Sequence, residues 1–249
     1  MVWSRLTLAA IGLLLALFEP VVGHADSEPR RMSAAEARNW QAVGRLNVSG
    51  TRFCTATLIA PDIVLTAAHC VFHPKTGKKV PVSEFRFVAG WRKGDYAARR
   101  RVADAQSLPG FVPGVPALDG VEHDLAVLRL RSPIPDNRAK PLGVTLPSRR
   151  GSSMTLVSYD HHRANAPSIR DTCLLMRVER AKAVTDCTII EGASGAPVLV
   201  QRDGNWLVAG VASAMGRIFT GREVTLLATA GSRVPDLIAE MDRSNWPRK

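Results

Sequence analysis

From Ala42 onward, short apolar runs alternate with turn-forming residues, and this alternation is the strongest constraint on the fold. The apolar runs cover residues 44–48, 54–59, 63–66, 85–89, 99–105 and 124–130, then 154–159, 172–179, 197–200, 206–214 and 223–229. Frequent short strands separated by Gly and Pro are typical of an antiparallel β-sandwich or β-barrel. The Pro-rich stretch 131–151 divides the strands into two sets and predicts a crossover between two β domains. The amphipathic pattern of residues 234–241, after Ser232 as a candidate N-cap, predicts a C-terminal helix.

The composition fits a folded chain with an ordinary core. Of the 249 residues, 46% are apolar and 22% are charged, and no long polar or acidic run indicates disorder. The formal net charge is +11, but the basic residues are scattered apart from Arg99-Arg100-Arg101 and Arg149-Arg150. Scattered basic residues are typical of solvated surface, so we expect no nucleic-acid partner.

The first 25 residues have the pattern of a secretory signal peptide. Arg5 precedes an apolar run over residues 6–18, and Gly23-His24-Ala25 places small residues where a signal peptidase reads them. The run is too short for a comfortable membrane span, although an uncleaved anchor is the alternative. We therefore expect a secreted or periplasmic protein with no membrane contact after cleavage. Residues 26–41 are polar, contain a capping box at Ser33 to Glu36, and are predicted to form a leader arm or propeptide outside the core.

Three stretches carry residues suited to nucleophilic catalysis. Residues 65–70 (LTAAHC) hold His69, residues 124–128 (DLAVL) begin with Asp124, and residues 192–197 (GASGAP) hold Ser194. Acyl transfer to a serine needs a base, a carboxylate that orients the base, and backbone N–H groups for the oxyanion. Each residue alone has a structural alternative: a buried histidine, a strand-start aspartate or an ordinary Gly/Ser turn. The order His, Asp, Ser excludes the α/β-hydrolases and the subtilisins, whose orders differ.

Taken together, the three stretches resemble the chymotrypsin-like (trypsin-fold) serine peptidases. The resemblance implies an all-β fold of two antiparallel six-stranded β-barrels with a C-terminal helix and an active site between the barrels. We place the barrels at 42–135 and 151–249, with a crossover linker at 136–150. The resemblance assigns His69 as base, Asp124 as its orienting carboxylate and Ser194 as nucleophile. The amides of Gly192 and Ser194 are then the expected oxyanion hole.

Four cysteines in an exported chain allow three disulfide pairings. The sequence-local pairings are Cys54 with Cys70 and Cys173 with Cys187, which would each close a loop in a separate half. The family places a disulfide beside its histidine at the spacing of Cys54 and Cys70. For Cys173 and Cys187 a disulfide in the second barrel is expected, and a pair of free thiols is the alternative.

Two departures from the family bear on activation and specificity. Ala193 stands where digestive and clotting members carry an aspartate that pairs with a new N-terminus, so that activation switch is not expected, and the chain is closer to the bacterial secreted branch. Thr188 stands where trypsin-like members carry the aspartate of the substrate pocket. The histidine of the glutamate-preferring members is also missing, since Ala212 and Ser213 occupy its place. The expected pocket residues are Thr188, Ser213, Ala214, Met215 and Gly216, and elimination leaves a small or apolar side chain before the cleaved bond.

We therefore predict a secreted, monomeric serine endopeptidase that acts on protein or peptide substrates through an acyl-enzyme intermediate. The alternatives are a catalytically inactive relative that binds a partner and an esterase on the same scaffold. No cofactor or metal is expected. Asp160, His161 and His162 are neighbours, but no second ligand pair stands at a suitable spacing, so a surface turn is predicted there.

Overall fold

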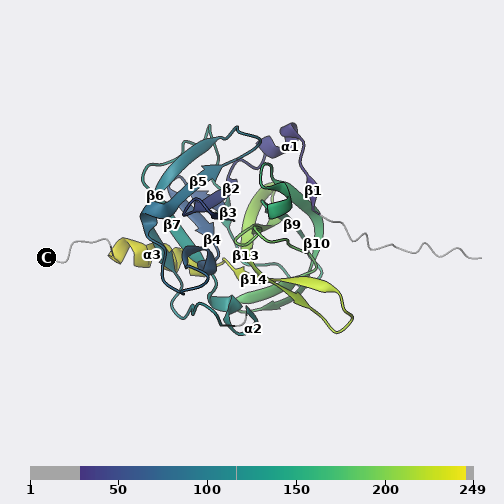
Figure 1. The fold of residues 1–249 in the computed structure, drawn as a ribbon. Helices are drawn as coiled ribbons and strands as arrows, with labels where there is room; N and C mark the ends of the chain where they lie inside the picture. The colour runs from purple at the N-terminus through teal and green to yellow at the C-terminus, as the bar shows by residue number, and fades with distance from the viewer. Residues whose placement is uncertain (1–28, 116, 245–249) are drawn as a thin grey trace, which may run out of the picture.

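The computed structural model describes residues 29–115 and 117–244, and the first of its two barrels is formed by the strands that follow Ala42 (Figure 1). These strands are β2 (Val43–Val48), β3 (Arg52–Ala60), β4 (Ile63–Thr66), β5 (Phe85–Ala89), β6 (Ala98–Ser107) and β7 (Ala126–Leu130). They close in the order β2-β3-β4-β7-β6-β5, and every neighbouring pair is antiparallel. Fully buried Leu46, Phe85, Phe87 and Leu128 fill the interior because alternate residues of each strand face inward.

The second barrel is built in the same way from the second half of the chain. Its strands are β9 (Ser153–Ser158), β10 (Ser168–Glu179), β11 (Lys182–Thr185), β12 (Pro197–Arg202), β13 (Asn205–Arg217) and β14 (Glu223–Thr229), and the pairing of β9 with β10 closes it. Two short strands extend this sheet: β1 (Arg30–Arg31) pairs with β10, and β8 (Gly143–Val144) in the linker pairs parallel to β13. The predicted all-β fold of two antiparallel six-stranded barrels is confirmed.

The segment before Ala42 packs on the body of the protein, which differs from the expectation of an arm outside the core. Helix α1 (Ala34–Arg38) has the predicted capping box between Ser33 and Glu36. Met32, Ala37 and Trp40 are buried, and the Trp40 ring lies 5.2 Å from that of Trp206 in β13. The expectation was wrong for these side chains because isolated apolar residues in a polar segment give no periodic signal of burial. The signal peptide predicted for residues 1–25 lies outside the described residues.

Each end of the described chain packs on the barrel that the other half of the chain forms. At one end, β1 joins the second barrel through β10. At the other end, α3 (Arg233–Ser244), the predicted C-terminal helix, lies against β6 and β7 of the first barrel (Figure 1). Its buried Leu237 and Met241 face that barrel's core, and Arg129 of β7 forms an ion pair with Asp242.

Both sequence-local disulfides are present. Cys54 is bonded to Cys70 and Cys173 to Cys187, so that each barrel carries one bridge and all four cysteines are oxidised. The remaining helices are short: α2 (Ala117–Gly120) and the 3-10 turns η1 (Ala68–Val71), η2 (Val82–Glu84), η3 (Val121–His123) and η4 (His161–Arg163). None of the helices among the described residues has the length and apolar character needed to span a membrane.

Candidate active site

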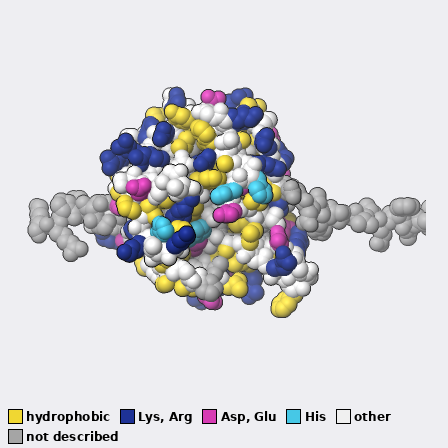
Figure 2. All heavy atoms as spheres, viewed as in Figure 1, with side chains coloured by type: hydrophobic (Ala, Val, Ile, Leu, Met, Phe, Trp, Pro, Cys, Tyr) yellow, Lys and Arg dark blue, Asp and Glu magenta, His cyan; other side chains and the backbone are white. Residues whose placement is uncertain are grey.

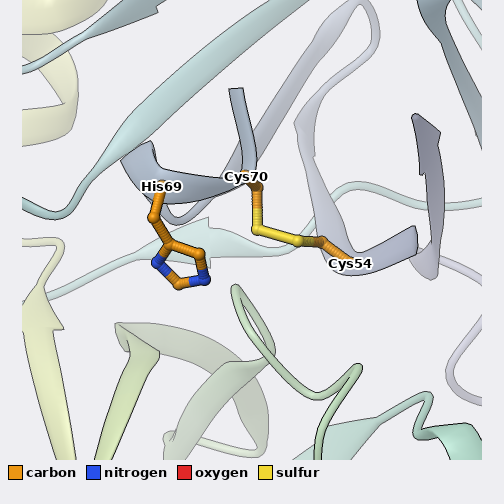
Figure 3. Close-up of side chains that lie close together, drawn as sticks. All are labelled: Cys54, His69 and Cys70. Carbon is orange, nitrogen blue, oxygen red and sulfur yellow. A yellow bond between two sulfur atoms is a disulfide. The ribbon is translucent and has the colours of Figure 1, made fainter. Parts of the chain in front are cut away.

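His69 is held on a short turn directly after a buried strand. Strand β4 ends at Thr66, and the 3-10 turn η1 then carries His69 with its ring about one-third exposed. The disulfide between Cys54 and Cys70 ties this turn to β3, and Figure 3 shows the His69 ring beside the bridge. The ligand atoms of these three residues lie within 4.8 Å of one another. They do not form a metal site, because sulfur atoms bonded to each other cannot bind a metal as thiolates.

Asp124 binds His69 through both of its carboxylate oxygens. Oδ1 accepts the backbone N–H of His69 at 2.8 Å, and Oδ2 lies 2.7 Å from Nδ1 of the ring. A third donor comes from the second barrel, where the Ser213 hydroxyl donates to Oδ2. Asp124 is only 3% exposed, and a buried carboxylate is stable only when such partners replace water. Because the sequence placed Ser213 only in the substrate pocket, its bond to Asp124 was missed.

Two glycines with positive φ shape the turn that carries Ser194. Gly192 has φ +97° and Gly195 has φ +76°, a region that glycine adopts without steric cost. Space also requires glycine: a Cβ on Gly195 would collide with the Thr66 hydroxyl and the Thr55 carbonyl, and one on Gly192 would collide with Phe53. The serine turn therefore packs closely against the first barrel, at Thr66, which lies two residues before the start of η1.

Thr55 of β3 joins the serine turn to the first barrel. Its backbone N–H donates to the Ser194 carbonyl at 2.9 Å, and its hydroxyl lies 3.3 Å from the Gly192 carbonyl. The same hydroxyl accepts the Tyr159 amide at 2.9 Å, and Thr66 donates its hydroxyl to the Thr55 carbonyl at 2.8 Å. These buried bonds fix the backbone of the nucleophile's turn beside β4, the strand that leads into the histidine turn.

The backbone amides of the serine turn fall into two groups. The Ala193 amide donates to the Ile190 carbonyl at 2.9 Å, and the Gly195 amide donates to the Ala212 carbonyl at 2.8 Å. Within the described residues, the amides of Gly192 and Ser194 donate to no protein acceptor. The turn therefore carries two available N–H groups at the positions where the sequence predicts an oxyanion hole.

The Ser194 hydroxyl is less firmly held than the His69 ring. Among the residues that the structure describes, no hydrogen bond joins the Ser194 hydroxyl to the His69 ring. Hydrogen bonds between catalytic groups are often long in unliganded structures and shorten when substrate binds. The structure thus brings His69, Asp124 and Ser213 into contact and fixes the Ser194 backbone nearby.

The candidate substrate residues lie along β13 and the loop after Cys187. Ser213, Ala214 and Gly216 are partly buried, and Met215 is 55% exposed. Thr225, which is opposite Met215 in the register of β13 and β14, donates its hydroxyl to the Cys187 carbonyl next to Thr188. This bond places the Thr188 loop beside β14, which pairs with the strand that carries the other candidate pocket residues.

A cavity of about 230 Å³ opens beside His69. His69, Asp124 and Ser213 line one wall, and Phe111 and Val121 of the Pro/Gly-rich loop 108–121 contribute to an apolar wall. The cavity can therefore accept a small apolar side chain of a ligand that lies along β13.

The Asp160 to His162 segment forms a turn, as the sequence predicts. The buried Asp160 carboxylate caps η4 by accepting the Arg163 amide at 2.8 Å, and it also accepts the Ser168 hydroxyl. The exposed His161 ring stacks on Phe53 with centroids 5.0 Å apart. These contacts give Asp160 and His161 structural partners.

Comparison with known proteins places the chain in a family. The family model described as Trypsin matches residues 30–227. Two solved structures have a similar fold. One is a Glu endopeptidase in complex with MPD, with a TM-score of 0.71 at 15% identity, covering 88% of this chain and 98% of that chain. The other is the thermostable serine protease AL20 from an extremophilic microorganism, with a TM-score of 0.66 at 16% identity, covering 83% and 99% of the two chains. Membership of the bacterial secreted branch stays a prediction, but the matched length is decisive for the family, and the chain belongs to the trypsin family.

Proposed function

We propose that this protein is a secreted serine endopeptidase that hydrolyses peptide bonds through an acyl-enzyme intermediate on Ser194. The observation that carries the proposal is the buried Asp124 carboxylate, which binds both the backbone N–H and Nδ1 of His69. This arrangement fixes the tautomer of the ring, because the proton on Nδ1 faces Asp124 and leaves Nε2 as an acceptor. A histidine held in this way beside a serine turn has the geometry of a general base.

The reaction follows from these roles. Nε2 of His69 takes the Ser194 hydroxyl proton while Oγ attacks the carbonyl carbon of the substrate, and the Asp124 carboxylate stabilises the imidazolium that forms. The imidazolium then gives its proton to the leaving amine, and the C–N bond breaks to leave an ester on Ser194. Water attacks this ester with His69 again as base, which releases the acid and restores the hydroxyl.

The charge that develops on the substrate oxygen needs donors that are already in place. The available amides of Gly192 and Ser194 are on the same turn as the nucleophile and supply two such donors. Positive φ at Gly192 and Gly195 supports this arrangement, since a turn of L-residues would not adopt it without strain.

The residues around the site favour substrates with small or apolar side chains before the cleaved bond. Thr188 offers no charge to a basic side chain, and the cavity beside His69 has an apolar wall. The substrate backbone would lie along Ser213 to Gly216 as an added strand. The two disulfides agree with export to an oxidising compartment. We further propose that the protein acts as a monomer.

One observation favours a second function. Because the described part of the chain shows no hydrogen bond between Ser194 and His69, the protein could be an inactive relative that binds a partner. Labelling with a fluorophosphonate separates the two functions, since only an activated serine reacts. We expect the wild type and Ser153→Ala, a change in an exposed serine of β9, to be labelled, and Ser194→Ala to remain unlabelled. Absence of label on the wild type would refute the hydrolase proposal.

Substrate class is tested by comparing casein digestion with the turnover of simple esters. An endopeptidase cleaves casein within its chain, and mass spectrometry of the fragments identifies the residue before each cleaved bond. Ester turnover without any cleavage of casein would instead support an esterase on the same scaffold.

A further inference from the structure

A basic pocket lies on the outer face of the first barrel and is separate from the candidate substrate strand. It is a cavity of about 300 Å³ whose wall includes Arg45 of β2, Arg52 and Phe53 of β3, Arg86 of β5 and Arg99 of β6. We call it the arginine pocket. Figure 2 shows basic side chains gathered over the first barrel around β6.

Strand register explains why arginines that are far apart in the sequence meet here. Arg45 in β2 is opposite Val88 in β5, and Val88 is in turn opposite Arg99 in β6, so these residues form one row across the outer face. In the next row, Asn47 pairs with both Phe53 and Arg86. The sequence suggested scattered basic residues, but the closed barrel concentrates four of them around one hollow.

No carboxylate in the described part of the chain neutralises the arginines of the pocket. Among the described residues, Arg45, Arg52, Arg86 and Arg99 form no ion pair with a carboxylate. The single acidic residue in the wall, Glu84, is exposed and forms no such pair either. Four guanidinium groups around one hollow thus create a strongly positive local potential.

Two of the arginines are also partly removed from water. Burial lowers the pKa of both Arg45 and Arg52, and Nε of Arg45 is buried without a hydrogen-bond partner. Their other contacts are uncharged: Arg45 lies 4.1 Å above the Phe53 ring and donates to the Ala164 carbonyl, and Arg52 donates to the carbonyls of Cys70 and Phe72. Half-buried cations with only neutral partners bind an incoming carboxylate strongly, because Arg and carboxylate form charge-assisted hydrogen bonds.

The pocket adjoins the catalytic residues on the side away from β13. Arg52 is bonded to the carbonyl of Cys70, the residue that follows His69. Phe53 is so close to Gly192 that a Cβ on that glycine would lie 2.9 Å from its ring. Ser213, at the start of the candidate substrate segment 213–216, lies on the opposite flank of His69, where its hydroxyl donates to Asp124. A substrate that runs along β13 and past Ser194 therefore continues toward Phe53 and the arginines.

We infer that the arginine pocket binds acidic side chains of the substrate that lie after the cleaved bond, on the leaving-group half. This inference rests on the proposed function, because it treats Ser194 as the point of cleavage. A nucleic acid would be held by a longer basic track that follows its phosphates. The position beside the histidine and serine turns favours a peptide, so binding of nucleic acid is one of the outcomes tested.

The test uses two quenched fluorogenic peptides with the same alanine-rich half before the cleaved bond. One carries three glutamates at the second to fourth positions after that bond, and the other carries three glutamines. We expect kcat/KM of the wild type to be several-fold higher for the glutamate peptide. Charge attraction near a surface is screened by salt, so this ratio should fall toward one in 0.5 M NaCl.

The matched variants each lose two positive charges. In Arg86→Gln/Arg99→Gln the two arginines come from the pocket, and in Arg149→Gln/Arg150→Gln they are exposed residues of the linker. We expect the ratio to fall about fivefold in the first variant, the effect of roughly 1 kcal/mol from two partly exposed ion pairs. The second variant should keep the ratio of the wild type. A wild-type ratio of one, or an equal loss in both variants, would overturn the inference.

Two further measurements keep the inference separate from the proposed function. If neither peptide is cleaved, binding of the labelled glutamate peptide to Ser194→Ala is measured by fluorescence anisotropy. The inference is supported, even if the protein is no peptidase, when the glutamate peptide binds more tightly than the glutamine peptide and this difference is lost in the variant that also carries Arg86→Gln/Arg99→Gln. Equal binding of the two peptides refutes the inference. A single-stranded oligonucleotide that binds through the same arginines more tightly than the glutamate peptide would show that nucleic acid is the ligand and refute the peptide assignment.

Discussion

The two barrels contribute to the active site in different ways. The first barrel supplies the candidate base and its candidate orienting acid, His69 and Asp124, which are already joined at 2.7 and 2.8 Å. The second barrel supplies a turn whose backbone is fixed through Thr55 but whose Ser194 hydroxyl has no hydrogen bond to His69 among the described residues. The second barrel also reaches Asp124 directly, through the Ser213 hydroxyl.

On the proposed function, this difference means that the contact between Asp124 and His69 is set by folding, and we expect substrate binding to complete the alignment of Ser194. A buried carboxylate must find its donors during folding, because leaving it unpaired is costly. The Ser194 hydroxyl is only partly buried, so it can bond to water and carries no such requirement. Changes to the first pair should therefore damage catalysis more than changes to the contacts around the serine turn.

The largest effect is expected from Asp124→Asn. The amide would hold the wrong tautomer of His69, and kcat should fall by about 10,000-fold, as such a change does in this type of triad. Asp160→Asn is the matched control, since Asp160 is equally buried beside the serine turn but does not contact His69. Steady-state kinetics on a casein-derived peptide measures both variants. A similar loss in Asp160→Asn would mean that the effect is structural.

Thr55→Val tests the contact that joins the serine turn to the first barrel. It leaves the Tyr159 amide unpaired and should lower the free energy of unfolding by about 2 kcal/mol. Displacement of the turn should lower kcat/KM by roughly 100-fold. In Thr57→Val, two positions along β3, the lost hydroxyl is buried without a hydrogen-bond partner, so stability should stay the same or rise. If urea unfolding shows that Thr55→Val and Thr57→Val are destabilised equally, the hydrogen bonds of the Thr55 hydroxyl are not what joins the serine turn to the first barrel.

Ser213→Ala removes the donor that the second barrel gives to Asp124. Because this bond is made to a charged group, its loss should lower kcat about tenfold, with little change in KM. Ser213→Thr keeps the hydroxyl and should recover most of the rate. If both variants have the same kcat, the hydroxyl has no part in positioning the acid.

The smallest difference is expected between the disulfides. The bridges close loops of similar length, with sequence separations of 16 and 14 between their partners, so replacing either pair with alanine should cost roughly 3 kcal/mol of stability. Calorimetry should thus show similar losses in Tm. Activity should fall more in Cys54→Ala/Cys70→Ala, because that bridge holds the histidine turn. A greater loss of activity in Cys173→Ala/Cys187→Ala would show that the bridge in the second barrel matters more for activity than the bridge beside His69.

Short-range patterns in the sequence were sufficient for much of this structure. Strand punctuation predicted two sets of antiparallel strands, and helical periodicity predicted the C-terminal helix. The two six-stranded barrels and the bridge beside His69 were implied by the resemblance to the chymotrypsin-like peptidases. The three candidate catalytic residues were each recognised within a stretch of five or six residues. That Asp124 contacts His69 is a finding of the structure.

Contacts that depend on the register of distant strands were not predicted. The bond from Ser213 to Asp124 and the role of Thr55 require the two barrels to be placed against each other. The arginine pocket depends on which residues of β2, β5 and β6 are opposite one another, which no local pattern specifies. The burial of Met32 and Trp40 was missed because each docks singly on a surface formed by residues much later in the chain.

The exchange of terminal segments between the barrels has a consequence for folding during synthesis. Arg30 leaves the ribosome early, yet its ion-pair partner Asp171 follows 141 positions later. The apolar surface of the first barrel likewise stays uncovered until α3, the last described element, has been synthesised and Leu237 and Met241 pack on it. The first barrel therefore lacks part of its packing until the residues up to Met241 have been translated, and we expect it to be incompletely packed while the second barrel is being synthesised.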